Sequence, residues 1–168
     1  TGELKSERIY FDIGEVLQET ADNLQYKAEK EGITMQLTHL EENAQVFADR
    51  NQVKQVLINL IENAIKYNQP NGEIYLSVKP YGDTSDKVLV SVQDTGIGID
   101  QKHIERVTER FFRVDKSRSR AKGGTGLGLS IVKHIMESHG EEFFIESTPQ
   151  EGSTFSFTLT CEEEPIAA

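Results

Sequence analysis

The chain has 168 residues, a formal net charge of −10, 36% hydrophobic residues and 27% charged residues. This composition is sufficient for a folded core, and its acidic balance disfavours a generic binder of nucleic acid or anionic membranes. The single cysteine, Cys161, excludes an internal disulfide and a cysteine-based zinc site, and no apolar run approaches the roughly 20 residues that span a bilayer.

The composition divides the chain into three parts. Residues 1–8 are polar and are expected to be a linker or the end of a preceding helical domain, residues 9–160 to form one domain, and residues 161–168 to be an acidic tail. Inside the domain, apolar residues recur at helical spacing from Ile13 to Ala28. Asp12 is the expected N-cap of this helix. Alternating and short apolar runs then predict strands at 33–37 and 46–48.

A second helix is predicted after Asp49, which resembles a capping box with Gln52 three residues later. It ends near Asn68, before Pro70. The remaining patterns predict strands at 74–78 and 88–92, helices at about 100–108 and 125–138, and a final hairpin built from 143–145 and 155–159. Because the strands come in hairpins, we predict a two-layer α/β sandwich, in which helices cover one face of a mixed, mostly antiparallel sheet.

The second helix carries an unusual polar stripe. At about 100° per residue, one side carries Asn59, Glu62, Asn63 and Lys66, opposite the apolar residues. Asparagine is a poor helix former, so two of them one turn apart favour a functional role over a solvated face. Amide oxygens suit a hard cation such as Mg²⁺, and lysine suits phosphate.

Two glycine-containing segments are further candidates. Asp94, followed by Gly96 and Gly98, ends a strand and could accept a hydrogen bond from an exocyclic amine; the alternative is a simple Asx turn. Residues 123–129 lead into a helix, where free backbone N–H groups favour an anion. They do not form a Walker A motif, because Leu129 stands where that motif has lysine.

The segment before this glycine run is basic. Residues 110–122 contain six lysines and arginines against one aspartate, a local charge of +5. The alternatives are a solvated loop or a nucleic-acid-binding loop. Beside an anion site, a basic loop is better explained as a lid over polyphosphate.

Five segments resemble the conserved sequence boxes of sensor histidine kinases and occur in the same order. They are the N box at 59–67 (NLIENAIKY), the G1 box at 94–98 (DTGIG), the F box at 111–115 (FFRVD), the G2 box at 124–128 (GTGLG) and the closing G3 segment at 152–155 (GSTF). The resemblance covers about residues 11–160 and implies a catalytic ATP-binding domain with the Bergerat fold. The lid and the G2 segment are most similar to phosphate-regulon-type sensor kinases.

The resemblance also implies site roles. Asn63 would bind Mg²⁺ with support from Asn59, Lys66 would meet phosphate oxygens, and Tyr67 would lie against adenine. Asp94 would accept from the adenine amino group, with Thr154 helping through water and with Gly96 and Gly98 opening the base pocket. The expected phosphate-binding backbone comprises Gly124, Thr125, Gly126, Leu127, Gly128 and Leu129. For transfer of the γ-phosphoryl group, the implied residues are Asn59, Lys66, Arg113 and Arg118.

The implied cofactors are ATP and Mg²⁺. The implied partners are a histidine-bearing dimerisation domain of the same protein and the receiver domain of a response regulator, but no nucleic acid. None of His39, His103, His134 and His139 has the sequence context of a phosphoacceptor, so that residue is expected outside this chain. We expect a monomeric, cytoplasmic domain of a homodimeric parent that is membrane-anchored.

Two alternative functions differ in their chemistry. An ATPase or protein serine kinase of the same fold carries glutamate where Asn59 stands, as a general base. Asparagine cannot take a proton, so this position disfavours rapid hydrolysis. An ATP-sensing module without catalysis is a further alternative, disfavoured by the presence of all five boxes.

Overall fold

The computed structural model describes residues 6–42, 44–83, 86–104, 106 and 128–161. In chain order its elements are β1 (Arg8–Asp12), α1 (Ile13–Lys30), β2 (Thr34–Leu40), β3 (Gln45–Asp49), α2 (Arg50–Lys66), β4 (Glu73–Pro80), β5 (Lys87–Asp94), α3 (Gln101–Ile104), α5 (Gly128–Ser138), β6 (Phe143–Thr148) and β7 (Gly152–Thr160). No helix within these ranges is long and apolar enough to cross a membrane.

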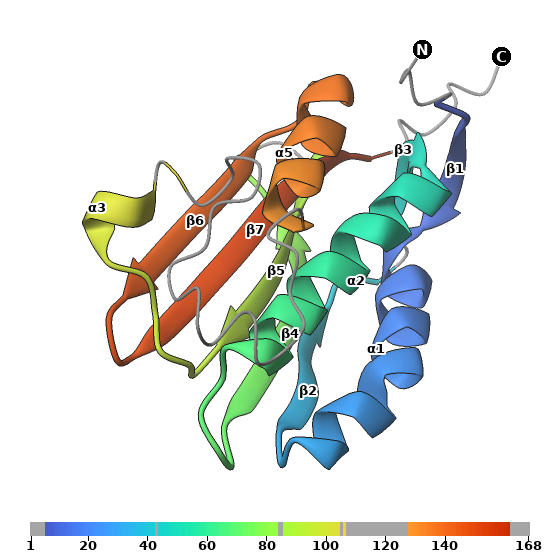
Figure 1. Ribbon diagram of the computed structural model, residues 1–168. Coiled ribbons are helices and arrows are strands. Elements are labelled where there is room, and N and C mark those ends of the chain that lie inside the picture. The colour runs from blue at the N-terminus through green and yellow to red at the C-terminus, as the bar shows by residue number, and fades with distance from the viewer. Residues whose placement is uncertain (1–5, 43, 84–85, 105, 107–127, 162–168) are drawn as a thin grey trace, which may run out of the picture.

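A five-stranded sheet forms one layer of the domain, in the order β2-β4-β5-β7-β6. Only β2 and β4 pair in parallel, and the other neighbours are antiparallel. Helices α1, α2 and α5 lie across the same face of this sheet (Figure 1). The predicted two-layer α/β sandwich with a mixed, mostly antiparallel sheet is therefore confirmed.

A second, two-stranded sheet was not predicted. Strands β1 and β3 pair antiparallel, with Tyr10 opposite Phe47 and their ring centroids 4.7 Å apart. Phe11 and Val46 point the other way and are buried. The short, polar segment around Arg8 gives little alternation from which a strand could be recognised. Its pairing with β3 depends on residues almost 40 positions away in the chain.

The core forms between the sheet and the apolar stripe of α2. Along that stripe Val53, Val56, Leu57, Leu60, Ile61 and Ala64 are all completely buried. They pack at the i, i+3, i+4, i+7 spacing of a helix that has one face on a core. The partly exposed stripe with Asn59 and Asn63 is consequently turned away from the sheet.

Aspartates cap both long helices. Asp12 accepts hydrogen bonds through Oδ1 from the N–H groups of Gly14 and Glu15, at 2.8 and 3.3 Å. Asp49 accepts through Oδ1 from the N–H of Gln52, at 3.1 Å. The capping box at Asp49 is only half formed, because Oε1 of Gln52 is buried without a partner in the described part of the chain.

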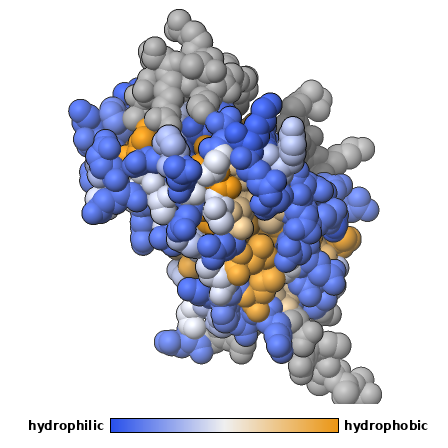
Figure 2. All heavy atoms as spheres, turned by 90° about the horizontal axis from the view of Figure 1, so that it is seen from below, coloured by the Kyte–Doolittle hydropathy of each residue, from blue (hydrophilic) through white to orange (hydrophobic). Residues whose placement is uncertain are grey.

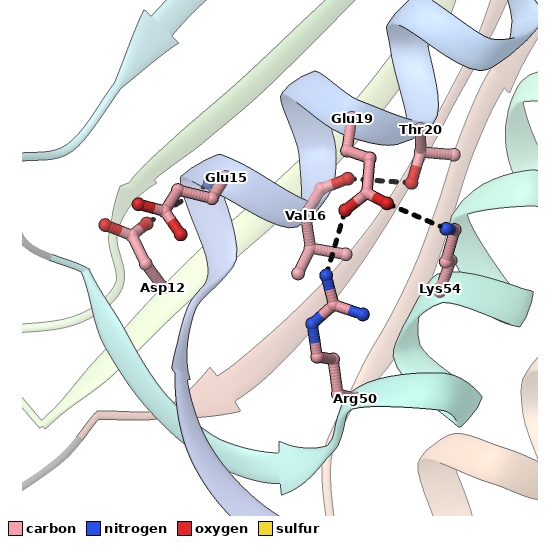
Figure 3. A network of polar contacts seen from close by, with 7 residues as sticks. All are labelled: Asp12, Glu15, Val16, Glu19, Thr20, Arg50 and Lys54. Atoms are coloured by element: carbon pink, nitrogen blue, oxygen red, sulfur yellow. Dashed lines mark hydrogen bonds and ion pairs between the residues drawn. The ribbon is translucent and has the colours of Figure 1, made fainter.

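The N-terminal halves of α1 and α2 are also joined by charged side chains (Figure 3). The carboxylate of Glu19 accepts from Arg50 Nη2 at 2.9 Å and from Lys54 Nζ at 3.1 Å. The hydrogen bond from Lys54 is the main cause that lowers the pKa of Glu19. These side chains are partly solvent-exposed, so the pairs orient the helices more than they stabilise the domain.

Leu17 provides a test of this packing, because its side chain on α1 is completely buried. Leu17→Ala should lower the free energy of unfolding by about 2–5 kcal/mol, through lost burial and the cavity left behind. Urea unfolding followed by circular dichroism measures this loss. Tyr26→Ala on the same helix is the control, because Tyr26 is 76% exposed. Equal unfolding free energies for the two variants would contradict the assigned core.

Candidate functional site

The polar stripe of α2 lies in the half of the helix that ends near the loop after β5. Figure 2 views the molecule from this end and shows hydrophobic patches set among hydrophilic atoms. Asn59 is held on both sides of its amide: Gln55 Nε2 donates to its Oδ1 at 3.2 Å, and its Nδ2 donates to the carbonyl of Gly128 at 3.4 Å. Asn59 therefore links the stripe to the start of α5, and its amide oxygen is already engaged.

Asn63 differs from Asn59 in its hydrogen bonding. Within the described residues, its side-chain amide makes no hydrogen bond. Gly128 lies close to it, because a Cβ on Gly128 would stand 3.9 Å from Asn63 Nδ2. The amide oxygen of Asn63 is thus available as a ligand for a hard cation. Lys66 follows one turn later and is also partly exposed.

The described residues contain no cluster of three His, Cys, Asp or Glu side chains that could hold a metal ion. The amide of Asn63 would supply one oxygen ligand of a cation, beside oxygens of water or of a bound phosphate. Mg²⁺ commonly binds in this way, because it keeps several waters and takes oxygens from substrate phosphates. The donor set around Asn63 fits Mg²⁺ in the presence of a nucleotide.

Asp94, the last residue of β5, is buried, with 7% of its surface exposed. Its Oδ1 accepts the N–H of Gly96 at 2.8 Å and the N–H of Ser153 at 3.3 Å. Burial raises the pKa of Asp94 to about 6, and the two backbone hydrogen bonds oppose this shift. Since both donors bind Oδ1, Oδ2 is the oxygen that can accept from a ligand.

Backbone contacts hold the end of α2 against the loop that follows Asp94. The N–H of Ile97 donates to the carbonyl of Tyr67 at 3.2 Å. Gly96 lies directly beneath that carbonyl, and a Cβ at this position would collide with the Tyr67 oxygen. Thr95 Oγ1 also donates to Asn68 Oδ1 at 3.2 Å. Glycine is therefore required at 96 for the polar stripe and Asp94 to come together.

The other side of this loop is attached to the turn between β6 and β7. Gly98 has φ = +72°, and a Cβ there would collide with the carbonyl of Thr148. The N–H of Ile99 donates to Ser147 Oγ at 2.6 Å, and Ser147 Oγ lies 2.7 Å from Ser153 Oγ. The loop is held on both sides, which gives Asp94 a fixed position.

The strand pairing places Ser153, not Thr154, beside Asp94. Ser153 is opposite Asp94 in the β5–β7 register, and Thr154 is opposite the exposed Gln93. Paired residues of adjacent strands share a face of the sheet, so Asp94 and Ser153 lie on the same face. Neighbouring residues of one strand point to opposite faces, so the side chain of Thr154 lies on the other face. The expected contact of Thr154 with the base through water remains a prediction that this register does not favour.

The sequence analysis missed Ser153 and Asn68 as residues of the site. The alternation along β7 was a usable signal, because Phe155 and Phe157 point into the core and Ser153 shares their face. For Asn68 there was no such signal. Its buried amide, which donates to the carbonyl of Glu73 at 3.0 Å, depends on how the α2–β4 connection folds.

Several expected site residues lie outside the described residues. These are Arg113, Arg118, Gly124, Thr125, Gly126 and Leu127. Gly128 and Leu129 are the first residues of α5. The side chain of Leu129 packs against the core, so only its backbone is available to a phosphate.

Comparison with known proteins gives the family. Residues 48–163 match the family described as histidine kinase-, DNA gyrase B-, and HSP90-like ATPase. The chain belongs to this family. It is 42% identical over 116 residues to the sensor histidine kinase WalK of Bacillus subtilis, covering 69% of this chain and 19% of that protein. It is 49% identical over 105 residues to the phosphate regulon sensor protein PhoR of Pseudomonas aeruginosa, covering 62% of this chain and 23% of that protein.

Solved structures of histidine kinases also match this chain. The catalytic domain of the histidine kinase ThkA superposes with a TM-score of 0.78 and 32% identity, covering 92% of this chain and 98% of that domain. A ThkA complex with the response regulator TrrA also matches, with a TM-score of 0.76 and 31% identity over 94% of this chain and 42% of that one.

The chain is therefore a histidine kinase catalytic domain of an ATPase family, and the predicted resemblance is confirmed. The likeness to phosphate-regulon sensors is confirmed by the match to PhoR. The chain spans only about a fifth of the length of WalK and PhoR.

The raised pKa of Asp94 predicts that the free energy of unfolding depends on pH. Its folded-state pKa of about 6 lies above the ordinary value of 3.8, so ionisation opposes folding above pH 6 and this cost disappears as the pH falls toward 4. Asp94→Asn keeps Oδ1 and removes the charge. The variant should be more stable than the wild type at pH 8, by up to about 3 kcal/mol, with the difference shrinking toward pH 4.

Urea unfolding at several pH values measures this difference. Asp22→Asn serves as the control, because Asp22 is an exposed residue of α1. A difference between Asp94→Asn and wild type that stays constant with pH would contradict the buried, ionised state of Asp94.

Proposed function

We propose that this domain binds Mg-ATP and transfers the γ-phosphoryl group to a histidine on a separate domain of the same protein. This proposal is supported by two different polar sites that lie close together at one end of α2. Asp94 offers a buried acceptor for the adenine amino group, and the stripe with Asn63 and Lys66 offers groups for phosphates. The contact between Tyr67 and the loop at Gly96 joins the two.

Adenine would be recognised by Asp94 Oδ2. A buried, ionised carboxylate with one free oxygen accepts a hydrogen bond from an amine but repels the carbonyl that guanine carries at the same ring position. Tyr67 would lie against the base at the end of α2. The resulting specificity for adenine rests on a single oxygen whose partner oxygen is fixed by the backbone.

The phosphates would lie between the polar stripe and the start of α5. Asn63 would bind Mg²⁺ with Asn59 supporting it, and Lys66 would meet phosphate oxygens. Backbone N–H groups from Gly124 to Leu129 would complete the cradle, as expected for glycine-rich backbone before a helix. The Mg²⁺ ion supplies charge neutralisation on the phosphates, and Arg113 or Arg118 would stabilise the charge that develops during transfer.

The proposed partners follow from the relatives. ThkA was solved in complex with the response regulator TrrA, which supports a receiver domain as the next phosphoryl acceptor for this protein. The first acceptor would be a histidine on the dimerisation domain of the same protein. We further propose a monomeric, cytoplasmic domain, with a homodimeric, membrane-anchored parent and no nucleic-acid partner.

The contacts of the polar stripe disfavour an ATPase or protein serine kinase. Such an activity needs a base beside the γ-phosphate. Asn59 cannot take a proton, and Glu62, the carboxylate of this stripe, pairs with Lys27 of α1 at 3.1 Å. Among the described residues of this stripe, Glu62 carries the carboxylate, and its ion pair holds it against α1.

Transfer can be tested with separated domains. The 168-residue chain, mixed with the histidine-bearing domain of its parent and γ-labelled ATP, should produce acid-labile, base-stable phosphate on that domain. The chain alone should release inorganic phosphate slowly. Rapid multiple turnover by the isolated chain would instead favour the ATPase alternative, and absence of protein-bound phosphate would favour an ATP sensor.

The proposed role of Asn63 predicts how ATP affinity depends on Mg²⁺. Asn63→Ala should abolish the Mg²⁺-dependent part of ATP affinity, while Asn51→Ala should leave it unchanged, because Asn51 is exposed in the first turn of α2. Titration calorimetry with Mg²⁺ and with EDTA separates the two contributions. If Asn63→Ala retains the wild-type response to Mg²⁺, the ion is held by other residues.

A further inference from the structure

Three segments meet at the other end of α2, away from the proposed nucleotide site. Asp49, the buried N-cap of α2, accepts the N–H of Glu7 through Oδ2 at 2.9 Å. Arg8 Nη2 donates to the carbonyl of Ser138 at 2.7 Å. The N–H of Asp49 donates to Nε2 of His139 at 3.1 Å. The chain before β1, the start of α2 and the end of α5 are thereby joined.

These contacts determine the protonation of His139. The Asp49 backbone N–H can only donate, so Nε2 of His139 must be an unprotonated acceptor. Nδ1 lies 2.9 Å from the carbonyl of Ile135, which can only accept, so Nδ1 must carry the hydrogen. The ring is therefore the neutral Nδ1–H tautomer. The segments joined here also carry the charged side chains of Glu7, Arg8, Asp49 and Arg50, the last of which pairs with Glu19.

Helix α5 is consequently attached to α2 at both ends. Asn59 donates to the carbonyl of Gly128, the first residue of α5, and Asp49 donates to His139, directly after its last residue. Eleven residues of helix separate the ends by roughly 16 Å. Between them, the contact depends on buried Val132, Ile135 and Met136. Apolar contacts of this kind are non-directional, so they leave the register of two helices less determined than hydrogen bonds do.

We propose that His139 is a positioning residue for nucleotide phosphates, acting through α5. Its hydrogen bond to Asp49 sets the far end of α5 on α2, which fixes Gly128 and Leu129 relative to Asn59 and Asn63. Loss of this bond lets α5 shift and moves the backbone N–H groups of these two residues away from the phosphates. Asp94 and its loop are held independently by Tyr67 and by the β6–β7 turn, so the adenine pocket is unaffected. This inference rests on the proposed function.

The test compares two ligands of the complete 168-residue chain. ATP uses the adenine pocket and the phosphate cradle, whereas adenosine uses only the former. His139→Ala should weaken Mg-ATP affinity about three- to tenfold and leave adenosine affinity unchanged. His139→Gln, whose side-chain oxygen can accept the Asp49 N–H, should restore most of the ATP affinity. The matched control is His134→Ala, on the exposed side of α5, which should alter neither affinity.

Each outcome bears on a different claim. Failure of the wild type to bind either ligand would reject the proposed function itself. Wild-type binding with an unchanged ATP affinity in His139→Ala, or an equal loss for ATP and adenosine, would overturn only the role of His139. Failure of His139→Gln to recover affinity would also overturn it. If His139→Ala does not fold, His139→Asn, which is polar but too short to reach Asp49, is judged by the same comparison.

A spectroscopic signature provides an independent check. Nitrogen-15 NMR of the histidine rings should show His139 with a protonated Nδ1 and an unprotonated Nε2. The opposite tautomer would overturn the proposal, because Nε2 could not then accept the Asp49 N–H.

Discussion

The burial of one side of α2 on the sheet is the constraint on which the rest of the site depends. Its six completely buried residues leave a single rotation of the helix about its axis. That rotation turns Asn59 and Asn63 away from the core, so the polar stripe is oriented by residues that have no proposed chemical role. The end of the helix then determines where the loop after β5 can pass, because Gly96 fits under the carbonyl of Tyr67.

Asp94 shows how function opposes stability in this domain. The residue occupies a position where its charge is costly, and burial is the main cause of its raised pKa. Two backbone N–H groups stabilise one oxygen and leave the second without such support. A protein selected for stability alone would carry a neutral residue here. Under the proposed function, a carboxylate at this position would be explained by a ligand that supplies the missing donor.

Much of the fold was predictable because its signals are local. The stripe of α2, the alternation of β4, β5 and β7, and the caps at Asp12 and Asp49 depend on residues close together in the chain. The strand β1 was not predictable, because its partner β3 follows a whole helix later. Likewise, Asn63 and Asp94 were proposed as site residues from their own motifs. Ser153 required the register between β5 and β7, and His139 required the packing of two helices.

The ion pair between Glu62 and Lys27 has a consequence for the lifetime of a bound nucleotide. It holds the carboxylate of the polar stripe against the neighbouring helix, and the amide of Asn59 cannot deprotonate an incoming water. Under the proposed function, a nucleoside triphosphate held there would stay intact until another protein surface presents a nucleophile, so the timing of the reaction would be a property of the encounter between domains.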